Sequence, residues 1–438
     1  MKKINIGLLG CGTVGTGVAK ILIENKELIS SRVGADLVLK KIADIDTERD
    51  RGIKFDKGVF TTDPFKVIED PDIDIIIEMI GGCGIANDLI LKAIDNNKHI
   101  VTANKALIAE KGNKIFSAAN KKGVDVAFEA SVGGCIPVIK SLRESLVGNR
   151  IKSISGILNG TCNYILSKIT NEGSTFNKAL EKAQANGFAE ADPTLDIEGI
   201  DAAHKIAILS SLAYGMELNF KDVYVEGITK ITPADIEYAK QFGYKIKLLA
   251  ISKEENGSVD IRVHPTMIPF NNLLSNVNGS LNAVTICGDA VGEILLYGHG
   301  AGMMPTASSV VGDTVDIARN ILSGSSRRIP LLSYCTDKIK KIPIIPIDEI
   351  STNYYFRFLT KDRAGVLAKI SGILGKFGIS LTSVTQKGRK SRGSITIVML
   401  THKAKESDIK KAMSEISTLD IISSEPVVIR LEDKNPED

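Results

Sequence analysis

Tryptophan is absent from the 438-residue sequence and aromatic residues make up only 5%, so aliphatic side chains must fill the hydrophobic cores. The formal net charge of +3 is small, and no polybasic run or arginine-rich helix accompanies it, which argues against a nucleic-acid partner. No apolar stretch reaches the roughly 18 residues that a membrane-spanning helix needs. We therefore expect a globular protein with neither a nucleic-acid nor a membrane partner.

Cysteine is sparse and shows no CxxC pairing. We expect free, mostly buried thiols in a cytoplasmic protein. The N-terminal stretch MKKINIGLLG combines two lysines with an apolar run, as a signal peptide does. Gly7 and Gly10 interrupt that run and no cleavage site follows, so we interpret it as a buried strand.

The length predicts two or three domains. Over the first 130 residues, apolar runs typical of strands alternate with helical patterns, which predicts a Rossmann-type, doubly wound parallel sheet. The predicted strands are 3–9, 37–44, 73–80, 99–103 and 123–130, and the predicted helices are 13–28 and 86–96.

The middle of the chain has an α+β pattern with a mixed or antiparallel sheet. Helices are expected at 137–145, 160–186, 199–214 and 310–322, the last after a glycine-rich turn at 298–309. Extended segments are expected at 151–158, 244–252, 259–265 and 281–287.

A proline-bearing linker, 338–352, precedes a C-terminal pattern of its own. Its order is strand, helix, strand, strand, helix, strand, which is the ferredoxin-like βαββαβ arrangement. These elements are expected at 354–359, 364–377, 379–386, 393–400, 405–416 and 420–430.

A glycine pattern, G-x-G-x-x-G, lies at Gly10, Gly12 and Gly15, between a predicted strand and a predicted helix. That context is typical of dinucleotide binding, because the glycines allow a tight turn, approach of backbone to a pyrophosphate, and close packing of helix and strand. The amides at the helix start bind phosphate, and Thr13 and Val14 complete the predicted cofactor-binding set. A purely structural glycine turn is the alternative.

The end of the second predicted strand reads ADID, and an acid there would bind the adenosine ribose of NAD. Asp44 and Asp46 are both candidates, and we predict Asp44 and NAD. Arg49 and Arg51 follow closely and could instead hold the 2′-phosphate of NADP. These residues could also be ordinary loop charges.

The segment 187–205, GFAEADPTLDIEGIDAAHK, holds five carboxylates and a single lysine, Lys205. Asp201 and Lys205 are four residues apart and so share one face of the predicted helix. Lys105 follows a predicted strand, at the sheet edge where ligands bind in open α/β sheets. The alternatives without a functional role are that the segment 187–205 is a polar loop leading into a surface helix and that Lys105 is a surface lysine at a helix start.

Several further motifs follow one another along the chain. Together with the glycine motif and the 187–205 segment, they are TANKALIAEKG (102–112), FEASVGGCIPVI (128–139), GILNGTCNYIL (156–166), HPTMIP (264–269) and GHGAGMMPTASSVVGDTVDIAR (298–319). In these motifs and in their order the chain resembles the homoserine dehydrogenase family over nearly its whole length. The tail segment 360–386 resembles an ACT domain. The resemblance implies reversible NAD(P)-dependent interconversion of L-aspartate 4-semialdehyde and L-homoserine, in threonine and methionine biosynthesis.

The resemblance also implies residue roles. Lys205 and Lys105 match catalytic lysines, and Glu190, Asp201 and Thr161 match substrate-binding residues. The glycines expected against the cofactor are Gly187, Gly300 and Gly302, and the resemblance places Lys105 near both the nicotinamide and the substrate, so that it is also a predicted cofactor-binding residue.

The loop FEASVGGCIP resembles the family's monovalent-cation loop. A sodium ion would be held by the Glu129 carboxylate and by the backbone carbonyls of Val132, Gly134 and Ile136. A tight strand-to-helix connection without a cation is the alternative.

The expected domains are a cofactor domain (1–131 with about 303–345), a substrate and dimerisation domain (132–302) and an ACT domain (353–431). The ACT resemblance implies an amino-acid effector, for which threonine is the natural candidate, and a homodimer or homotetramer. An ACT domain that only dimerises is the alternative.

Two other functional hypotheses compete with that of a homoserine dehydrogenase. A Rossmann methyltransferase or another amino-acid dehydrogenase is one of them, but a methyltransferase gives no reason for two lysines among acids. A non-catalytic amino-acid sensor is the second, and it would be expected to lack Lys205, which is present.

Overall fold

The computed structural model describes residues 2–387 and 394–432, and the chain separates into two compact units. Unit 1 comprises Met1–Gly160, Asp201–Val223 and Leu281–Ile342, and unit 2 comprises Thr161–Ile200, Tyr224–Ser280 and Pro343–Asp438. The domain boundaries expected at residues 131, 302 and 345 stay a prediction.

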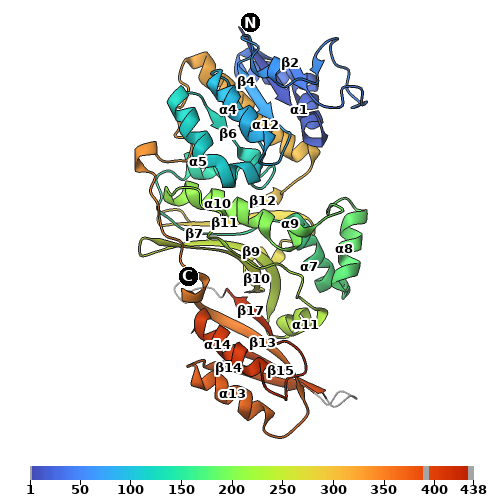
Figure 1. Ribbon diagram of the computed structural model, residues 1–438, viewed down its shortest axis with the longest axis vertical. Coiled ribbons are helices and arrows are strands. Elements are labelled where there is room, and N and C mark those ends of the chain that lie inside the picture. The colour runs from blue at the N-terminus through green and yellow to red at the C-terminus, as the bar shows by residue number, and fades with distance from the viewer. Residues whose placement is uncertain (1, 388–393, 433–438) are drawn as a thin grey trace. The chain divides into compact units, whose positions relative to one another are not determined.

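The described part of unit 1 holds a parallel sheet in the order β3-β2-β1-β4-β5-β6, with helices on its faces (Figure 1). Its strands are β1 (Lys2–Leu9), β2 (Ala35–Ala43), β3 (Phe60–Thr61), β4 (Ile75–Glu78), β5 (His99–Thr102) and β6 (Val126–Ala127). This strand order is that of a doubly wound dinucleotide-binding sheet, so the predicted fold class is confirmed. Ile75, Ile76 and Ile77 of β4 are fully buried, as the apolar run predicted.

The helices of this sheet are α1 (Thr13–Glu24), α2 (Lys26–Val33), α3 (Phe65–Ile68), α4 (Ile85–Asp95), α5 (Lys105–Lys122) and α12 (Met303–Ser323). The single helix predicted over 13–28 is wrong, because the chain breaks at Asn25, whose amide closes α1 on the Ile21 carbonyl. Helix α12 returns from late in the sequence to pack on α1. A Cβ at Gly17 would lie 2.9 Å from the Met303 carbonyl oxygen, so this contact requires a glycine.

The remainder of unit 1 includes an antiparallel group of strands in the order β7-β11-β12. Its elements are α6 (Val138–Lys140), a π-helical turn (Ser141–Ser145), β7 (Ile151–Ile157), β11 (Leu281–Gly288), β12 (Gly292–His299) and most of α10 (Ile200–Tyr214). Strand β12 was not predicted, and α12 begins at Met303 rather than at residue 310. The prediction failed because no residue of β12 is buried, so the strand lacks the apolar alternation that marks a half-buried strand.

Unit 2 is built around the antiparallel hairpin of β9 (Tyr244–Glu255) and β10 (Ser258–Pro269). Asn256 and Gly257 turn the chain with φ of 52° and 82°, as a two-residue hairpin loop requires. The other elements are α7 (Gly160–Glu172), α8 (Phe176–Ala185), α9 (Thr194–Ile197), β8 (Tyr224–Val225) and α11 (Pro233–Gln241).

The tail of unit 2 has the predicted βαββαβ order with one additional two-residue strand, β16, before its second helix, and α13 and α14 lie on one face of its sheet (Figure 1). Its elements are β13 (Ser351–Lys361), α13 (Val366–Lys376), β14 (Leu381–Lys387), β15 (Ser394–Thr401), β16 (Ala404–Lys405), α14 (Glu406–Ser417) and β17 (Val427–Leu431). Strand β17 is shorter than the predicted 420–430, and residue 393 of the predicted strand 393–400 lies outside the described residues. Strand β17 pairs with β13 on one side and with β10 on the other.

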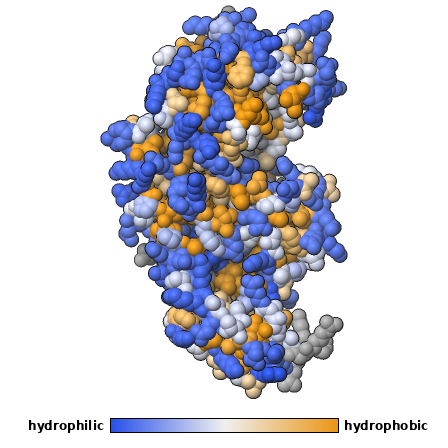
Figure 2. Space-filling model, in the orientation of Figure 1, coloured by the Kyte–Doolittle hydropathy of each residue, from blue (hydrophilic) through white to orange (hydrophobic). Residues whose placement is uncertain are grey.

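Hydrophilic residues cover much of the face drawn in Figure 2, with hydrophobic ones interspersed. Among the helices of the described residues, none is both long and apolar enough to cross a membrane. All six cysteines are free, as predicted, but only Cys11 and Cys162 are buried, so the expectation of mostly buried thiols is wrong.

Candidate active site

The glycine motif forms the tight loop between β1 and α1. Gly10 has a φ of +90°, and a Cβ there would lie 2.8 Å from the backbone of Met79. A Cβ at Gly15 would lie 2.1 Å from the Gly10 carbonyl oxygen. Among the described residues, nothing lies within 4 Å of a Cβ at Gly12, the N-cap of α1. The first and third glycines therefore serve packing, and the second leaves open space at a helix N-terminus, which suits a phosphate.

Asp44 and Arg51 lie together beside this loop. Asp44 accepts a hydrogen bond from the Cys11 amide (2.5 Å), and Arg51 donates to the Cys11 carbonyl oxygen (2.9 Å). The Arg51 side chain is 2% exposed and its Nη2 lies 3.4 Å from the Asp44 carboxylate. The Asp44 carboxylate and the Arg51 guanidinium thus lie beside the end of β2, where the adenosine ribose of a dinucleotide or its 2′-phosphate would bind.

The Lys105, Asp201 and Lys205 side chains meet in unit 1. Lys105 opens α5, and the preceding Asn104 caps that helix by accepting from the Leu107 amide. The Asp201 carboxylate, 5% exposed, binds Lys105 through one oxygen (2.5 Å) and Lys205 through the other (2.7 Å). The spacing of four residues on α10 places Asp201 and Lys205 together, as predicted.

Asn159, just after β7, belongs to the same group although the sequence analysis did not identify it. Its side-chain amide donates to the Asp201 carboxylate (2.9 Å), and Lys205 also donates to the Leu158 carbonyl oxygen (2.6 Å). Its position in GILNGTCNYIL, a segment that carries the family resemblance, was the available signal. These contacts orient the Lys205 ammonium from two sides.

Electrostatics keep Asp201 ionised. Burial alone would raise the pKa of this carboxyl, but the charges of Lys205 and Lys105 hold it well below its usual range. The group therefore carries two ammonium ions and one carboxylate. This net positive charge suits a substrate oxygen that becomes negative during reaction.

His204, next to Lys205 on α10, is a second buried polar group near this site. Its ring packs on Phe220 at a tilt of 36°, with centroids 4.2 Å apart, and Nε2 lies 3.7 Å from the Glu110 carboxylate. Burial lowers the pKa of His204, so we treat it as a neutral packing residue.

The predicted cation loop follows β6. Glu129 is 3% exposed, and its carboxylate oxygens accept the amides of Ile139 and Lys140 at 2.8 Å each. Burial, followed by the charge of Asp313, raises the pKa of Glu129 to about 7.

The donor set of this loop fits a hard monovalent cation. Val132, Gly134 and Ile136 follow Glu129, and a Cβ at Gly134 (φ +58°) would lie 2.6 Å from the Gly300 backbone, so the loop is closely packed. The four predicted residues offer only oxygen atoms, a carboxylate and backbone carbonyls, which suit sodium. No group of three or more His, Cys, Asp and Glu side chains able to hold a metal occurs among the described residues.

Of the other predicted site residues, Thr161, Gly187 and Glu190 lie in unit 2 and Gly302 lies in unit 1. The Thr161 hydroxyl, at the start of α7, contacts the Phe188 carbonyl oxygen (2.6 Å) and the Asp196 carboxylate (3.1 Å). Gly187 has a φ of +71°, and Glu190 is exposed. Gly302, with a φ of 127°, is the N-cap of α12 in unit 1.

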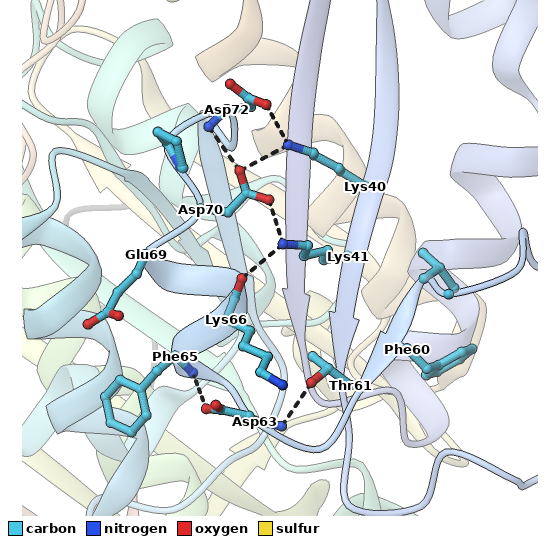
Figure 3. A pocket seen from close by; sticks show the side chains of 13 residues that line it. Lys40, Lys41, Phe60, Thr61, Asp63, Phe65, Lys66, Glu69, Asp70 and Asp72 are labelled. Atoms are coloured by element: carbon cyan, nitrogen blue, oxygen red, sulfur yellow. Dashed lines mark hydrogen bonds and ion pairs between the residues drawn. The ribbon is translucent and has the colours of Figure 1, made fainter.

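A hollow of about 680 Å³ lies along β2, β3 and α3, and none of the predicted site residues lines it (Figure 3). Lys40 and Lys41 both bind Asp70, at 2.9 and 2.7 Å, and Lys40 also binds Asp72. These contacts hold the pKa of Asp70 well below its usual value despite burial. Because its charges compensate one another, we assign this hollow no chemistry.

Comparison with known protein families gives three matches along the chain. Residues 10–129 match the homoserine dehydrogenase NAD-binding domain, residues 137–315 match homoserine dehydrogenase, and residues 354–420 match the ACT domain.

Curated relatives and solved structures agree with those matches. The homoserine dehydrogenases of Neisseria gonorrhoeae and Pseudomonas aeruginosa are 48% and 47% identical, each match covering 99% of this chain and 99% and 100% of the relative. A homoserine dehydrogenase structure from Thiobacillus denitrificans has a TM-score of 0.93 at 45% identity, covering 99% of each chain. A hyperthermophilic archaeal homoserine dehydrogenase in complex with NADPH has a TM-score of 0.62 at 28% identity, covering 72% of this chain and 97% of that one.

Proposed function

Because this chain belongs to the homoserine dehydrogenase family of NAD(P)-dependent oxidoreductases, we propose that Lys205 and Lys105 perform the acid–base chemistry of the reaction. The reaction is the reversible reduction of L-aspartate 4-semialdehyde to L-homoserine, in threonine and methionine biosynthesis. The observation that carries this proposal is the buried Asp201 carboxylate shared by the two lysines.

The nicotinamide, when bound, supplies or accepts the hydride. In the direction of reduction, Lys205 donates a proton to the aldehyde oxygen as negative charge develops there. Asp201, Asn159 and the Leu158 carbonyl orient that ammonium. Lys105, 43% exposed at the start of α5, adds a second positive charge.

The substrate is a zwitterion, so it needs an acceptor for its ammonium as well as a donor for its carbonyl. We assign the ammonium to Glu190 and Asp201, with Thr161 as a further polar contact. The exposure of Glu190 leaves its carboxylate available to a ligand.

The cofactor would be held at the N-terminus of α1, by the open backbone at Gly12 and the amides of Thr13 and Val14, and Gly187 and Gly302 are assigned to the same cofactor. Asp44 at the end of β2 favours NAD, because a carboxylate repels the 2′-phosphate of NADP. NADP remains the alternative cofactor, because the Arg51 guanidinium, which could bind the 2′-phosphate, lies 3.4 Å from that carboxylate.

The loop of Glu129, Val132, Gly134 and Ile136 is proposed to bind sodium through oxygen atoms. Its packing against Gly300 supports a role in holding the loop before α12.

The ACT domain is proposed to bind an amino-acid effector, threonine, and to contribute to a homodimer or homotetramer. Gly365, with a φ of +85°, is the N-cap of α13, and backbone amides at a helix start suit a carboxylate. A cytoplasmic location stays a prediction.

The decisive experiment compares Lys205→Met with Lys98→Met in NAD(P)H-linked turnover of homoserine. Lys98 is a matched control, because it is another buried lysine of unit 1 and donates to the carbonyl oxygens of Asp70 and Ile73. Loss of a general acid should lower the kcat of Lys205→Met by about 100-fold or more. Cofactor binding, followed by fluorescence, should hardly change. A Lys205→Met enzyme with more than half of normal turnover would refute the assignment.

A further inference from the structure

Arg430 joins the C-terminal strand β17 to two other parts of unit 2. It is 4% exposed, and its guanidinium binds both oxygens of Glu406, at 2.6 and 2.9 Å, where α14 begins. It also donates to the Glu226 carboxylate (2.7 Å) and lies over the Tyr224 ring (5.0 Å). The Arg430 side chain of the ACT domain therefore contacts both β8, through Tyr224, and the residue that follows β8, Glu226.

The segment 226–228 carries that contact onward to the chain around α9. The Glu226 amide donates to the Val263 carbonyl oxygen on β10, and the Ile228 amide donates to the Ile197 carbonyl oxygen (2.9 Å). Between them, a Cβ at Gly227 would lie 2.3 Å from that Ile197 oxygen. Backbone thus packs directly on backbone at Gly227, so a shift of Glu226 would be passed to the chain around α9.

The segment 226–228 packs against residues 187–199, which we call the substrate loop. The Thr161 hydroxyl contacts the Phe188 carbonyl oxygen and the Asp196 carboxylate, and Gln184 donates to the Glu190 carbonyl oxygen (3.1 Å). The loop is therefore held by α7, α8 and the segment 226–228. It leads straight into α10, which carries Asp201 in its first turn.

We infer that Arg430 is a positioning residue for the dehydrogenase reaction: through Glu226 it holds the segment 226–228 against the substrate loop, so that the ACT strand β17 takes part in homoserine binding. This inference rests on the proposed assignment of Glu190 to the substrate. Its competitor is an ion pair that only stabilises the attachment of the ACT domain.

The chain offers a matched control for that competitor. Arg357, on β13, binds Asp235 through two nitrogen atoms, at 2.6 and 3.0 Å. Asp235 is fully buried on α11, which packs on β9. This pair also attaches the ACT domain to the rest of unit 2, but through α11.

The test uses Glu226→Gln in the full-length enzyme, because Arg430 then keeps its pairing with Glu406 and the fold is preserved. The KM for homoserine should rise about tenfold, the scale of one lost charge-assisted hydrogen bond, while the KM for the cofactor stays within about twofold. Hydrogen exchange, followed by mass spectrometry, should become faster in peptides from the substrate loop. Arg430→Lys, which keeps the charge but loses the forked geometry, should lie between wild type and Glu226→Gln.

Arg357→Gln should lower the unfolding temperature without this split between the two KM values. If Arg357→Gln and Glu226→Gln change the homoserine KM and loop exchange equally, the pair serves attachment alone and the inference is overturned. Glu190→Gln separates the two proposals. If it leaves the homoserine KM unchanged, the assignment of the loop to the substrate fails; if it raises the KM and Glu226→Gln does not, only the role of Arg430 fails.

Discussion

Replacing Asp201 with asparagine should cost more stability than removing the lysine it binds. The site holds two ammonium ions and one carboxylate, so Asp201→Asn removes the carboxylate that lies 2.7 Å from the Lys205 ammonium, whose side chain is only 8% exposed. Breaking a buried ion pair in this way costs about 3–5 kcal/mol. Lys105 is 43% exposed and stays solvated, so the penalty falls mainly on Lys205.

Lys205→Met should be milder. Asp201 then keeps Lys105 and Asn159 as partners, so its charge stays compensated. The hydrogen bonds that Lys205 donates to Asp201 and to the Leu158 carbonyl oxygen are lost, but the desolvation cost of the buried ammonium is relieved at the same time. A hydrogen bond from a charged donor contributes about 1.5–3 kcal/mol. The two variants should therefore differ by about 2 kcal/mol at pH 7 although both lose turnover.

Urea denaturation followed by circular dichroism measures this difference through the shift in midpoint. In Asp201→Asn, the buried Lys205 ammonium has lost the Asp201 carboxylate and is disfavoured in the folded state, so the cost of the substitution should diminish as pH rises and the amine loses its proton. The gap between the variants should accordingly narrow toward pH 10. If Asp201→Asn is as stable as Lys205→Met at pH 7, or if the gap does not depend on pH, the charge balance described here is wrong.

Three further predictions concern the cofactor, a buried lysine and the cation loop. The enzyme should use NADH at least as well as NADPH in kcat/KM assays; a tenfold preference for NADPH would contradict the role of Asp44, and Arg51→Gln should then abolish that preference. Burial lowers the pKa of Lys247 to about 7 from 10.5, so the folded state binds fewer protons than the unfolded state between those values and stability should rise with pH there. Relative to Lys247→Met, the unfolding free energy of wild type should rise by about 1 kcal/mol per pH unit between pH 7.5 and 9, and parallel profiles would contradict this. Sodium chloride should raise the melting temperature more than choline chloride at equal ionic strength, and Glu129→Gln should lose that difference; equal effects of both salts on wild type would argue against the site.

Much of the cofactor unit could be predicted because its signals are local. Buried parallel strands appear in the sequence as short apolar runs, and the glycine motif indicates the turn between β1 and α1. Weak local signals failed in the same unit: the half-exposed β12 was missed, and the helix predicted over 13–28 breaks at Asn25. The spacing of apolar residues in a sequence identifies elements that bury one face. Neither the exposed strand β12 nor the helix break at Asn25 produces such a spacing.

The sequence by itself determined which residues could do the chemistry, and spacing within one helix placed Asp201 beside Lys205. Only the tertiary structure brought Lys105 and Asn159 to the same carboxylate, because three segments distant in the chain must pack before those contacts exist. The same holds for β17, whose apolar pattern predicted a strand but not its partners. Its pairing with β10, and hence the Arg430 contact with Glu226, depends on the register between strands, and that register arises from packing of side chains far apart in sequence.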